Sequence, residues 1–213
     1  FCEYCLEDSR LVRDILRHEG LIELSLRRSL LTGLPLERAW GSVAAFDFLY
    51  IGELHRRGMV APTNDVDRVR LGGAPGGFVM PSKVGLYHHV FVFDFKSLYP
   101  SIIRTFNIDP LSHLQARGVP STSLASRDAP IAAEDSPDYV TEPGRAGELI
   151  RAPNGALFVP EAGILPQMLA GFFDERAQAR AIGDELAAYT YKIVMNSFYG
   201  VLATGSCRFA EGA

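Results

Sequence analysis

The sequence has few cysteines and no long apolar run. Its three cysteines, Cys2, Cys5 and Cys207, are too few for a disulfide framework. Cys2 and Cys5 form a C-x-x-C pair without a second pair, so we expect reduced thiols in the cytoplasm and no zinc site. No stretch approaches the ~18 apolar residues that span a bilayer, and no signal peptide is visible. These absences argue against a secreted disulfide-rich domain and against a membrane partner.

Lysine is also scarce. The 21 cationic residues include three lysines, Lys83, Lys96 and Lys192, and the net charge is −4. Proteins that hold nucleic acid by its phosphates usually present a basic surface, which this composition does not indicate. A lysine inside a patterned segment is therefore a candidate functional residue rather than incidental surface charge.

The sequence does contain regular helical patterning. The chain has 213 residues, of which 47% are hydrophobic, enough for one or two domains with a core. Apolar residues at helical spacing predict helices over 3–32, 40–57, 98–106, 164–181 and 184–200. Gly20 is a candidate break in the first of these, Gly33 and Pro35 end it, and Gly183 marks the turn between the last two.

The rest of the chain is expected to be strand or loop. Two short strands are predicted near 77–81 and 89–94. Residues 60–76 contain Pro, Asn and Gly and are expected to be a loop. Residues 111–156 are rich in Ser, Pro, Ala and Gly, and a loop of that length is unusual inside a compact domain. We interpret it as an inserted, mobile surface segment.

The first candidate site is the run 94–101, Asp-Phe-Lys-Ser-Leu-Tyr-Pro-Ser. It follows the apolar residues 90–93, which predict a buried strand. Asp94 offers the hard oxygen ligand that Mg²⁺ prefers. Ser97 is a good helix N-cap and Pro100 is tolerated in a first turn, so backbone N–H groups there can face an anion. The alternative is a strand–turn–helix corner in which Asp94 merely caps.

The second candidate site is the run 192–200, Lys-Ile-Val-Met-Asn-Ser-Phe-Tyr-Gly. Lys192, Asn196 and Tyr199 fall on one stripe of a helix that spans roughly 10 Å at about 1.5 Å per residue. A cation at one end and an aromatic ring at the other suit a nucleotide. The alternative is an ordinary solvated face. Gly200 is either a helix C-cap or a position where a base pair approaches the backbone.

Together the two runs resemble motifs A and B of the B-family DNA polymerases, in the right order. The longer run 97–106, followed by 108–110, is most similar to a bacterial member of the family. Other parts of the chain resemble the family less specifically. Gly76 and Gly77 look like the glycine pair that joins the exonuclease part to the polymerase part. Residues 163–166, with Arg176 and Arg180, are similar to the start of the fingers helix. Tyr4 and Asp8 match the third exonuclease motif.

This resemblance implies an α+β fold: a partial palm of short antiparallel strands plus helices, a helical-hairpin fingers subdomain and a helical N-terminal segment. The implied divisions are 1–60 for the end of the exonuclease domain and connecting helices, 61–110 for the palm part with motif A, 111–162 for a flexible inserted loop of the palm, and 163–213 for the fingers hairpin with motif B. The partners implied are primer–template DNA and deoxynucleoside triphosphates, with a sliding clamp held through other regions.

The resemblance also implies roles for individual residues. Asp94 and the carbonyl of Phe95 would hold Mg²⁺, of which the family uses two ions. Backbone N–H groups of Ser97, Leu98 and Tyr99 would face the triphosphate, and the Tyr99 ring would exclude a 2′-hydroxyl; its alternative is a core aromatic.

On the fingers side, Arg176, Arg180 and Lys192 would neutralise the triphosphate, and Lys192 is the candidate general acid toward pyrophosphate. Surface ion pairs of the arginines with Asp174 and Glu175 are the alternative. Asn196 and Tyr199 would line the base-pair pocket. DNA would contact Gly76, Gly77, Tyr199 and Gly200.

Two departures from the family pattern matter. The second catalytic carboxylate belongs to an Asp-Thr-Asp segment that this sequence lacks, and one aspartate does not hold two ions. We therefore expect a polymerase fragment that is inactive alone, from the cytoplasm of a bacterium, near its nucleoid. The exonuclease pair Tyr4 and Asp8 also lacks its partner carboxylates, so no 3′→5′ exonuclease activity is expected. The rival hypotheses are a non-catalytic DNA- or nucleotide-binding module derived from a polymerase, and an interaction scaffold built on the N-terminal helices.

Overall fold

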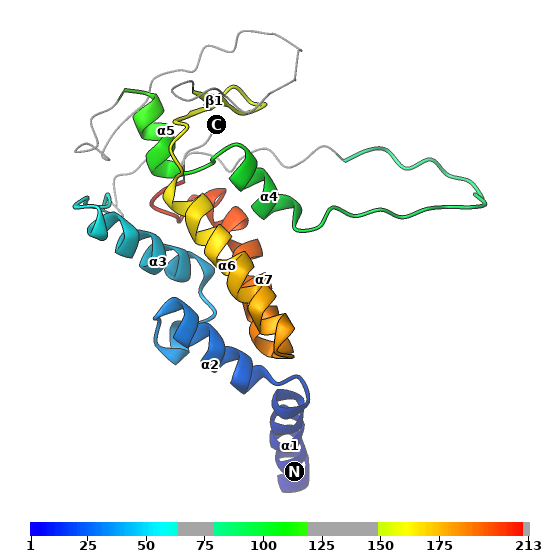
Figure 1. Cartoon of the computed structure of the whole chain (residues 1–213). Coiled ribbons are helices and arrows are strands. Elements are labelled where there is room, and N and C mark those ends of the chain that lie inside the picture. The colour runs from blue at the N-terminus through cyan, green and yellow to red at the C-terminus, as the bar shows by residue number, and fades with distance from the viewer. Residues whose placement is uncertain (64–78, 119–148, 211–213) are drawn as a thin grey trace.

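The computed structural model describes residues 1–63, 79–118 and 149–210 (Figure 1). In chain order, its helices are α1 (Cys2–His18), α2 (Leu21–Thr32), the short 3-10 helix η1 (Leu36–Arg38), α3 (Ser42–Arg56), α4 (Leu98–Thr105), α5 (Pro110–Ala116), α6 (Ile164–Ala181) and α7 (Glu185–Leu202). Strands β1 (Ile150–Arg151) and β2 (Leu157–Phe158) pair antiparallel, with Ile150 opposite Phe158. The described part is thus mostly helical with a small antiparallel sheet, which agrees with the expected α+β class.

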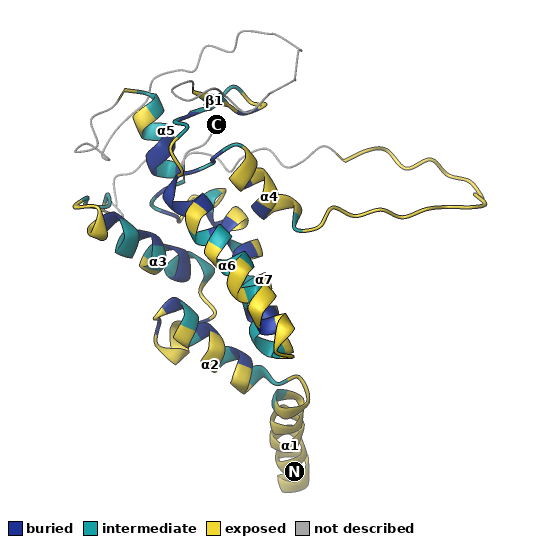
Figure 2. Cartoon of the chain, viewed as in Figure 1, coloured by how far each residue is buried: buried dark blue, intermediate teal, exposed yellow. Residues whose placement is uncertain are grey.

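An antiparallel hairpin of α6 and α7 forms the centre of the molecule, with α3 and α4 packed against it (Figure 1). Buried side chains concentrate where these four helices meet (Figure 2). On α7, Phe198 is fully buried and its ring meets that of Phe46 of α3 edge-on, with centroids 5.3 Å apart. Truncation of a buried Phe to Ala costs about 3–5 kcal/mol, so Phe198 is a principal determinant of how α7 docks.

Glycines end the helices where the sequence predicts. Gly20 separates α1 from α2 with φ +60°, and Gly33 ends α2 with φ +72°. Gly183 turns the α6–α7 hairpin with φ +77°, a left-handed conformation that costs least in glycine. The next residue, Asp184, caps α7 by accepting a 2.9 Å hydrogen bond from the N–H of Ala187.

The prediction of a buried strand near 89–94 is wrong. Residues 79–97 are extended but carry no strand assignment, and they leave the body of the protein as an exposed ribbon (Figure 1). Phe91 is 78% exposed and Phe93 is 89% exposed. An apolar run forms a strand only when a neighbour pairs with its N–H and C=O groups. The ribbon runs out and back (Figure 1), but its two limbs carry no strand and no pairing with each other. Residues 77 and 78 of the other expected strand lie outside the described residues.

The range 111–162 is more structured at its ends than an inserted loop. At its beginning, Asp109 caps α5 and Pro110 occupies the first position of that helix, a favourable start for a helix. At its end, Asn154 and Gly155 turn the β1–β2 hairpin, with Gly155 at φ +87°. Both signals were available in the sequence. Residues 119–148 lie outside the described part.

Helix α1 differs from the other long helices because none of its residues is buried (Figure 2). Most of its apolar side chains, among them Tyr4, Leu11 and Ile15, are at least half exposed, and Leu16 is partly buried. It packs against α2 and extends away from the α6–α7 hairpin (Figure 1). Neither α1 nor any other helix in the described part is long and apolar enough to cross a bilayer.

Candidate functional site

The start of α4 presents the first candidate run. Pro100 and Ile103 are buried, and they fix α4 so that Tyr99 faces outward. Ser97 occupies the N-cap position as expected, but its side chain makes no capping hydrogen bond and its backbone is left-handed, with φ +55°. The first N–H groups of a helix have no intrahelical partner. Those of Leu98 and Tyr99 are therefore left without an intrahelical acceptor at the start of α4.

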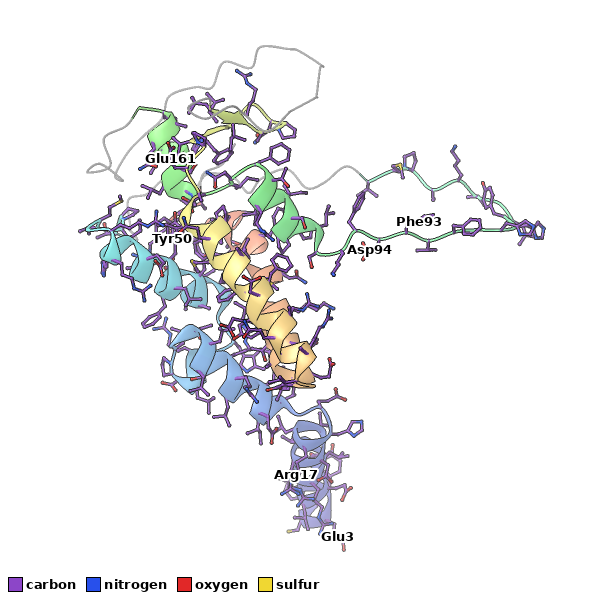
Figure 3. The ribbon with its side chains drawn as sticks, in the orientation of Figure 1. Glu3, Arg17, Tyr50, Phe93, Asp94 and Glu161 are labelled. Carbon is purple, nitrogen blue, oxygen red and sulfur yellow. The ribbon has the colours of Figure 1, made fainter. Side chains whose placement is uncertain are left out.

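Asp94 lies where the exposed ribbon reaches α4 (Figure 3). Its side chain is exposed, and so is that of Phe95, which is 75% exposed. The carboxylate thus projects from an extended segment rather than from the end of a buried strand. The alternative of a simple capping role is not supported, because Asp94 stands outside α4, whose N-cap is Ser97.

The second candidate run occupies the C-terminal half of α7, and its polar and apolar residues lie on separate faces of the helix, as predicted. Lys192, Asn196 and Tyr199 are all exposed along one stripe, while Val194 and Phe198 are buried on the opposite side. Gly200 lies inside α7, which ends with Ala203 as its C-cap, so the C-cap alternative for Gly200 is wrong. Apart from its chain neighbours and the backbone of α7 itself, no atom of the described residues lies within 4 Å of a Cβ added at Gly200. This end of the stripe is open.

Two aromatic rings join the candidate runs. The rings of Tyr99 on α4 and Tyr199 on α7 are stacked, with centroids 4.1 Å apart and an interplanar angle of 16°. Tyr99 is 44% exposed and Tyr199 is 47% exposed, so Tyr99 is not the core aromatic of the alternative interpretation. The fold therefore brings together two segments about a hundred residues apart, as a shared site requires.

Helix α6 contributes a cationic group to the same hairpin. The Nε of Arg176 is buried and has no hydrogen-bond partner within the described residues. Burial lowers the pKa of the Arg176 guanidinium, and the charge of Arg180 on the same helix lowers it further. An anion between the two arginines would relieve both effects, because it would supply the missing acceptor and the opposite charge.

The alternative for these arginines was surface pairing with Asp174 and Glu175. Among the residues that the structure describes, neither arginine forms such an ion pair. Glu175 instead acts on Tyr191 of α7: burial, then the Glu175 charge and hydrogen bond, raise the pKa of that hydroxyl. Arg104 of α4 lies over the Phe173 ring of α6 at 5.3 Å, a cation–π contact that ties the two helices together.

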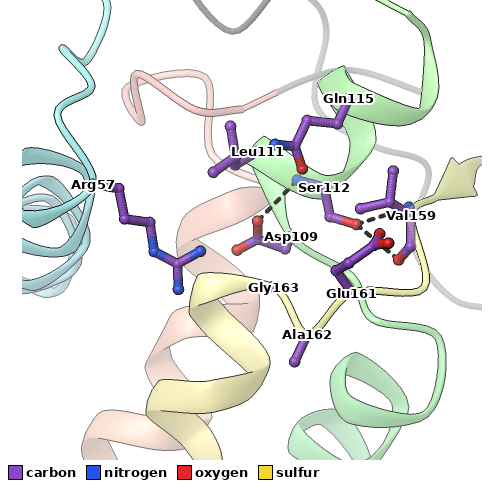
Figure 4. A pocket seen from close by; sticks show the side chains of 9 residues that line it. All are labelled: Arg57, Asp109, Leu111, Ser112, Gln115, Val159, Glu161, Ala162 and Gly163. Atoms are coloured by element: carbon purple, nitrogen blue, oxygen red, sulfur yellow. Dashed lines mark hydrogen bonds between the residues drawn. The ribbon is translucent and has the colours of Figure 1, made fainter.

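A cavity of about 400 Å³ lies at the N-terminal end of α6, and sequence reasoning did not identify it (Figure 4). Its lining side chains are Arg57, Asp109, Leu111, Ser112, Gln115, Val159, Glu161, Ala162 and Gly163. Asp109 is 1% exposed and accepts hydrogen bonds from the Tyr50 hydroxyl and from the N–H groups of Ser112 and Leu165. One carboxylate therefore caps α5, holds the first turn of α6 and fixes α3. The sequence signal for the capping role of Asp109 was its position directly before Pro110, which is typical of a helix start.

Burial of Asp109 disfavours the charged form of its carboxyl group. Burial raises the pKa of its carboxyl, and the hydrogen bonds from Leu165, Ser112 and Tyr50 oppose that change. Asn107 strengthens the same junction, because its Oδ1 accepts a 2.8 Å hydrogen bond from the N–H of Gly163. All the polar groups of Asp109 that point inward are thus matched by donors of the fold itself, which indicates a structural junction.

The start of α4 offers one carboxylate, Asp94, as a candidate metal ligand. No group of three or more His, Cys, Asp or Glu in the described part could hold a metal ion. Asp94 and the carbonyl of Phe95 carry oxygen atoms of the kind that Mg²⁺ takes, since this ion uses one or two carboxylates and keeps several waters. A pair of ions about 3.5–4 Å apart needs a further carboxylate.

The other predicted residues are placed as follows. Tyr4 and Asp8 lie on the exposed helix α1, away from the Tyr99–Tyr199 contact (Figure 1). Gly76 and Gly77 lie outside the described residues. The structure thus places Tyr99 of the first candidate run against Tyr199 of the second and keeps Tyr4 and Asp8 on a separate helix.

Comparison with known proteins identifies the class. Residues 42–210 match the family model described as DNA polymerase family B. This stretch holds the α4 start, the α6 arginines and the α7 stripe, and the chain belongs to that family. The resemblance of the two motifs is therefore confirmed.

Individual relatives agree with this. The chain is 39% identical over 208 residues to DNA polymerase II of Escherichia coli strain K12, a match that covers 98% of this chain and 23% of that protein. It is 35% identical over 148 residues to the DNA polymerase of Orf virus strain NZ2, covering 60% of this chain and 14% of the relative. It is 26% identical over 212 residues to the DNA-directed DNA polymerase of Enterobacteria phage T4, covering 97% of this chain and 21% of the relative. The chain thus spans about a quarter or less of these relatives' lengths.

Proposed function

We propose that this chain forms the part of a DNA-directed DNA polymerase that binds the incoming deoxynucleoside triphosphate. The observation that carries the proposal is the contact of Tyr99 with Tyr199, because it joins the carboxylate-bearing segment to the cationic hairpin. A triphosphate between them would meet N–H groups at the start of α4 on one side and Arg176, Arg180 and Lys192 on the other.

Each residue then has a chemical role in nucleotidyl transfer, in which a primer 3′-hydroxyl attacks the α-phosphate and pyrophosphate leaves. Asp94 and the Phe95 carbonyl would hold Mg²⁺, which would supply charge stabilisation to the phosphates when bound. The N–H groups of Ser97, Leu98 and Tyr99 face the phosphates at the helix start. The Tyr99 ring lies under the sugar and selects deoxyribose.

The hairpin supplies the remaining contacts. The guanidinium groups of Arg176 and Arg180 bind phosphate oxygens in pairs. Lys192 neutralises the triphosphate and is the proton donor to pyrophosphate. Asn196 and Tyr199 line the nascent base pair, where an aromatic face accepts any base. The open space beside Gly200 leaves room for DNA at the backbone, and Gly76 and Gly77 are further DNA contacts outside the described residues.

The subdomain assignment is part of the same proposal. Residues 163–213 are the fingers, supported by the α6–α7 hairpin and its exposed cations. Residues 61–110 are the palm part with motif A, and 111–162 are an insertion of the palm with α5 and β1–β2 at its ends. Residues 1–60 are the end of an exonuclease domain with its connecting helices, where Tyr4 and Asp8 are the remnant of its third motif.

The proposed whole polymerase uses two Mg²⁺ ions, primer–template DNA, all four deoxynucleotides and, through other regions, a sliding clamp. It would act in the bacterial cytoplasm at the nucleoid, as the similarity to DNA polymerase II of Escherichia coli suggests. The chain alone supplies one carboxylate at the site, so we expect it to bind nucleotide without extending a primer. Template-dependent extension by the purified chain with Mg²⁺ would contradict this expectation.

Nucleotide binding is the direct test. Affinity of the purified chain for dTTP with Mg²⁺ is measured by equilibrium dialysis for wild type, Arg176→Gln, Lys192→Gln and the control Arg17→Gln, an exposed cation on α1. Removal of a charged hydrogen bond costs about 1.5–3 kcal/mol, so the first two variants should bind about tenfold or more weakly. The control should bind as wild type does. Equal affinity of all four proteins would refute the proposal.

The second candidate function is a non-catalytic nucleotide- or DNA-binding module derived from a polymerase. The observation that favours it is the single carboxylate at the described site, with no metal-binding group of three in the described part. The gene downstream of residue 213 decides between the two. An Asp-Thr-Asp segment there supports the polymerase, and a stop codon without one supports the module.

A further inference from the structure

The two stacked tyrosines are held by different elements, each fixed by its own core contacts. Tyr199 follows Phe198, which is fully buried, and Tyr99 precedes Pro100, which is buried. The rings are nearly parallel at 16°, and 4.1 Å between centroids means that each covers one face of the other. Tyr199 therefore has one face left for a base, and its other face is used by Tyr99.

We infer that Tyr199 is a positioning residue for sugar selection: it holds the Tyr99 ring in the one orientation that excludes a 2′-hydroxyl. The inference rests on the proposed function, because it presupposes that Tyr99 lies under the sugar. It adds a second role to Tyr199, which acts on the sugar through Tyr99 while its free face and edge serve the base pair.

The physical reason is the freedom of an exposed ring. Tyr99 is 44% exposed, and a half-exposed side chain exchanges among staggered rotamers unless a neighbour restrains it. Exclusion of the 2′-hydroxyl requires the Tyr99 ring to stay in one position, since a mobile ring would move aside. Among the described residues, Tyr199 is the aromatic ring that packs on Tyr99.

The aromatic ring of Tyr199, and not its hydroxyl group, restrains the Tyr99 ring. Neither tyrosine hydroxyl makes a hydrogen bond to another described residue. Phenylalanine at position 199 should therefore keep the stack, while leucine keeps apolar volume and helix propensity but removes the flat face. This contrast separates positioning by stacking from simple filling of space.

The experiment compares dATP with ATP. Dissociation constants of both, with Mg²⁺, are measured by calorimetry for the purified chain and for Tyr199→Leu, Tyr199→Phe and Tyr99→Ala. Tyr189→Ala is the matched control, since Tyr189 is a 51% exposed tyrosine on the same helix. Circular dichroism verifies that each variant keeps its helices, and Tyr199→Ala stands in if Tyr199→Leu loses them.

The ratio of ATP to dATP dissociation constants is the readout. An aromatic pair is worth about 0.5–1.5 kcal/mol, so Tyr199→Leu should lower the ratio about twofold to tenfold, mainly by improved ATP binding. Tyr199→Phe and Tyr189→Ala should keep the wild-type ratio. If Tyr199→Leu unfolds, Tyr199→Ala takes its place with the same expected fall in the ratio, and an unchanged ratio in that variant overturns the inference.

Failure of the inference and failure of the proposed function look different. If Tyr99→Ala lowers the ratio and Tyr199→Leu does not, Tyr99 selects the sugar unaided and the positioning role is wrong. If wild type binds neither nucleotide, binds both equally, or keeps its ratio in Tyr99→Ala, the proposed function is wrong and the inference falls with it.

Discussion

Arg27 on α2 and Asp184 at the tip of the α6–α7 hairpin are 157 positions apart in sequence, yet Nη2 of Arg27 lies 2.9 Å from Oδ2 of Asp184. The other carboxylate oxygen of Asp184 caps α7 through the N–H of Ala187. One side chain thus starts a helix and joins the hairpin to the N-terminal helices.

These two roles of Asp184 should separate in stability measurements. Replacement Asp184→Ala removes the cap and the ion pair, and a lost N-cap costs about 0.5–2 kcal/mol. Asp184→Ser keeps a capping oxygen and loses the pair, which is worth about 0–1 kcal/mol because Arg27 is 48% exposed. Urea denaturation should therefore give a larger loss in free energy of unfolding for alanine than for serine. Equal losses would show that the ion pair, and not the cap, dominates.

Gly163 should be irreplaceable for a steric reason. A Cβ at this position would lie 2.6 Å from Cβ of Asp109, at the junction where α6 begins. We expect Gly163→Ala to destabilise the chain by about 1–3 kcal/mol through overpacking.

Gly171, in the middle of α6, is the matched control, because nothing lies within 4 Å of an added Cβ there. Gly171→Ala should raise the free energy of unfolding by about 0.5–1 kcal/mol, as expected for glycine in a helix interior. Thermal denaturation of both variants tests the pair of predictions. A stable Gly163→Ala protein would mean that the junction yields readily.

The buried carboxyl of Asp109 should make stability depend on pH. Burial raises its pKa above the ordinary 3.8, so the folded state keeps the proton to higher pH than the unfolded state does. The stabilisation from this group is thus present at low pH and is lost as the pH rises from about 4 through the folded pKa. Urea denaturation of wild type and Asp109→Asn over this range should show the wild type losing stability relative to the variant as pH rises.

Asp14 on α1 provides a control of opposite sign for this experiment. The Arg13 hydrogen bond lowers the pKa of the Asp14 carboxyl, so its small contribution is lost as pH falls rather than as it rises. A wild type that gains stability relative to Asp109→Asn as the pH rises would contradict the assigned direction for Asp109.

Gly200 should show opposite effects on stability and binding. It lies inside α7 with open space around it, so Gly200→Ala should stabilise the helix by about 0.5–1 kcal/mol. If DNA approaches the backbone there, the added methyl group should weaken primer–template binding, measured by fluorescence anisotropy. Unchanged affinity in a stabilised variant would remove Gly200 from the proposed DNA contacts.

The helices could be predicted from the sequence because their signals are local. Gly20, Gly33 and Gly183 end helices where the pattern indicates, and the apolar and exposed faces of α7 follow from residues three and four apart. The expected strand near 89–94 does not form, because strand formation depends on a partner that an apolar pattern cannot show. Helix α5 and the β1–β2 hairpin were missed although Pro110 and Gly155 signalled them.

The exposed face of α7 was predictable from the sequence, and the contact between the two candidate runs was not. The stripe of Lys192, Asn196 and Tyr199 is exposed as its spacing predicts. The stacking of Tyr199 on Tyr99 depends on how two remote helices dock on one core, and no local pattern encodes that. The same holds for the three donors that meet at Asp109, which come from α3, α5 and α6.

The ribbon at 79–97 has a practical consequence for handling the purified chain. Phe91, Val92 and Phe93 are 78%, 91% and 89% exposed, in an extended stretch without a charged or proline residue among them. Extended apolar segments whose backbone groups are unpaired are templates for intermolecular β-pairing. We expect self-association to rise with protein concentration and to begin at these residues, and a charged substitution at Val92 to delay it.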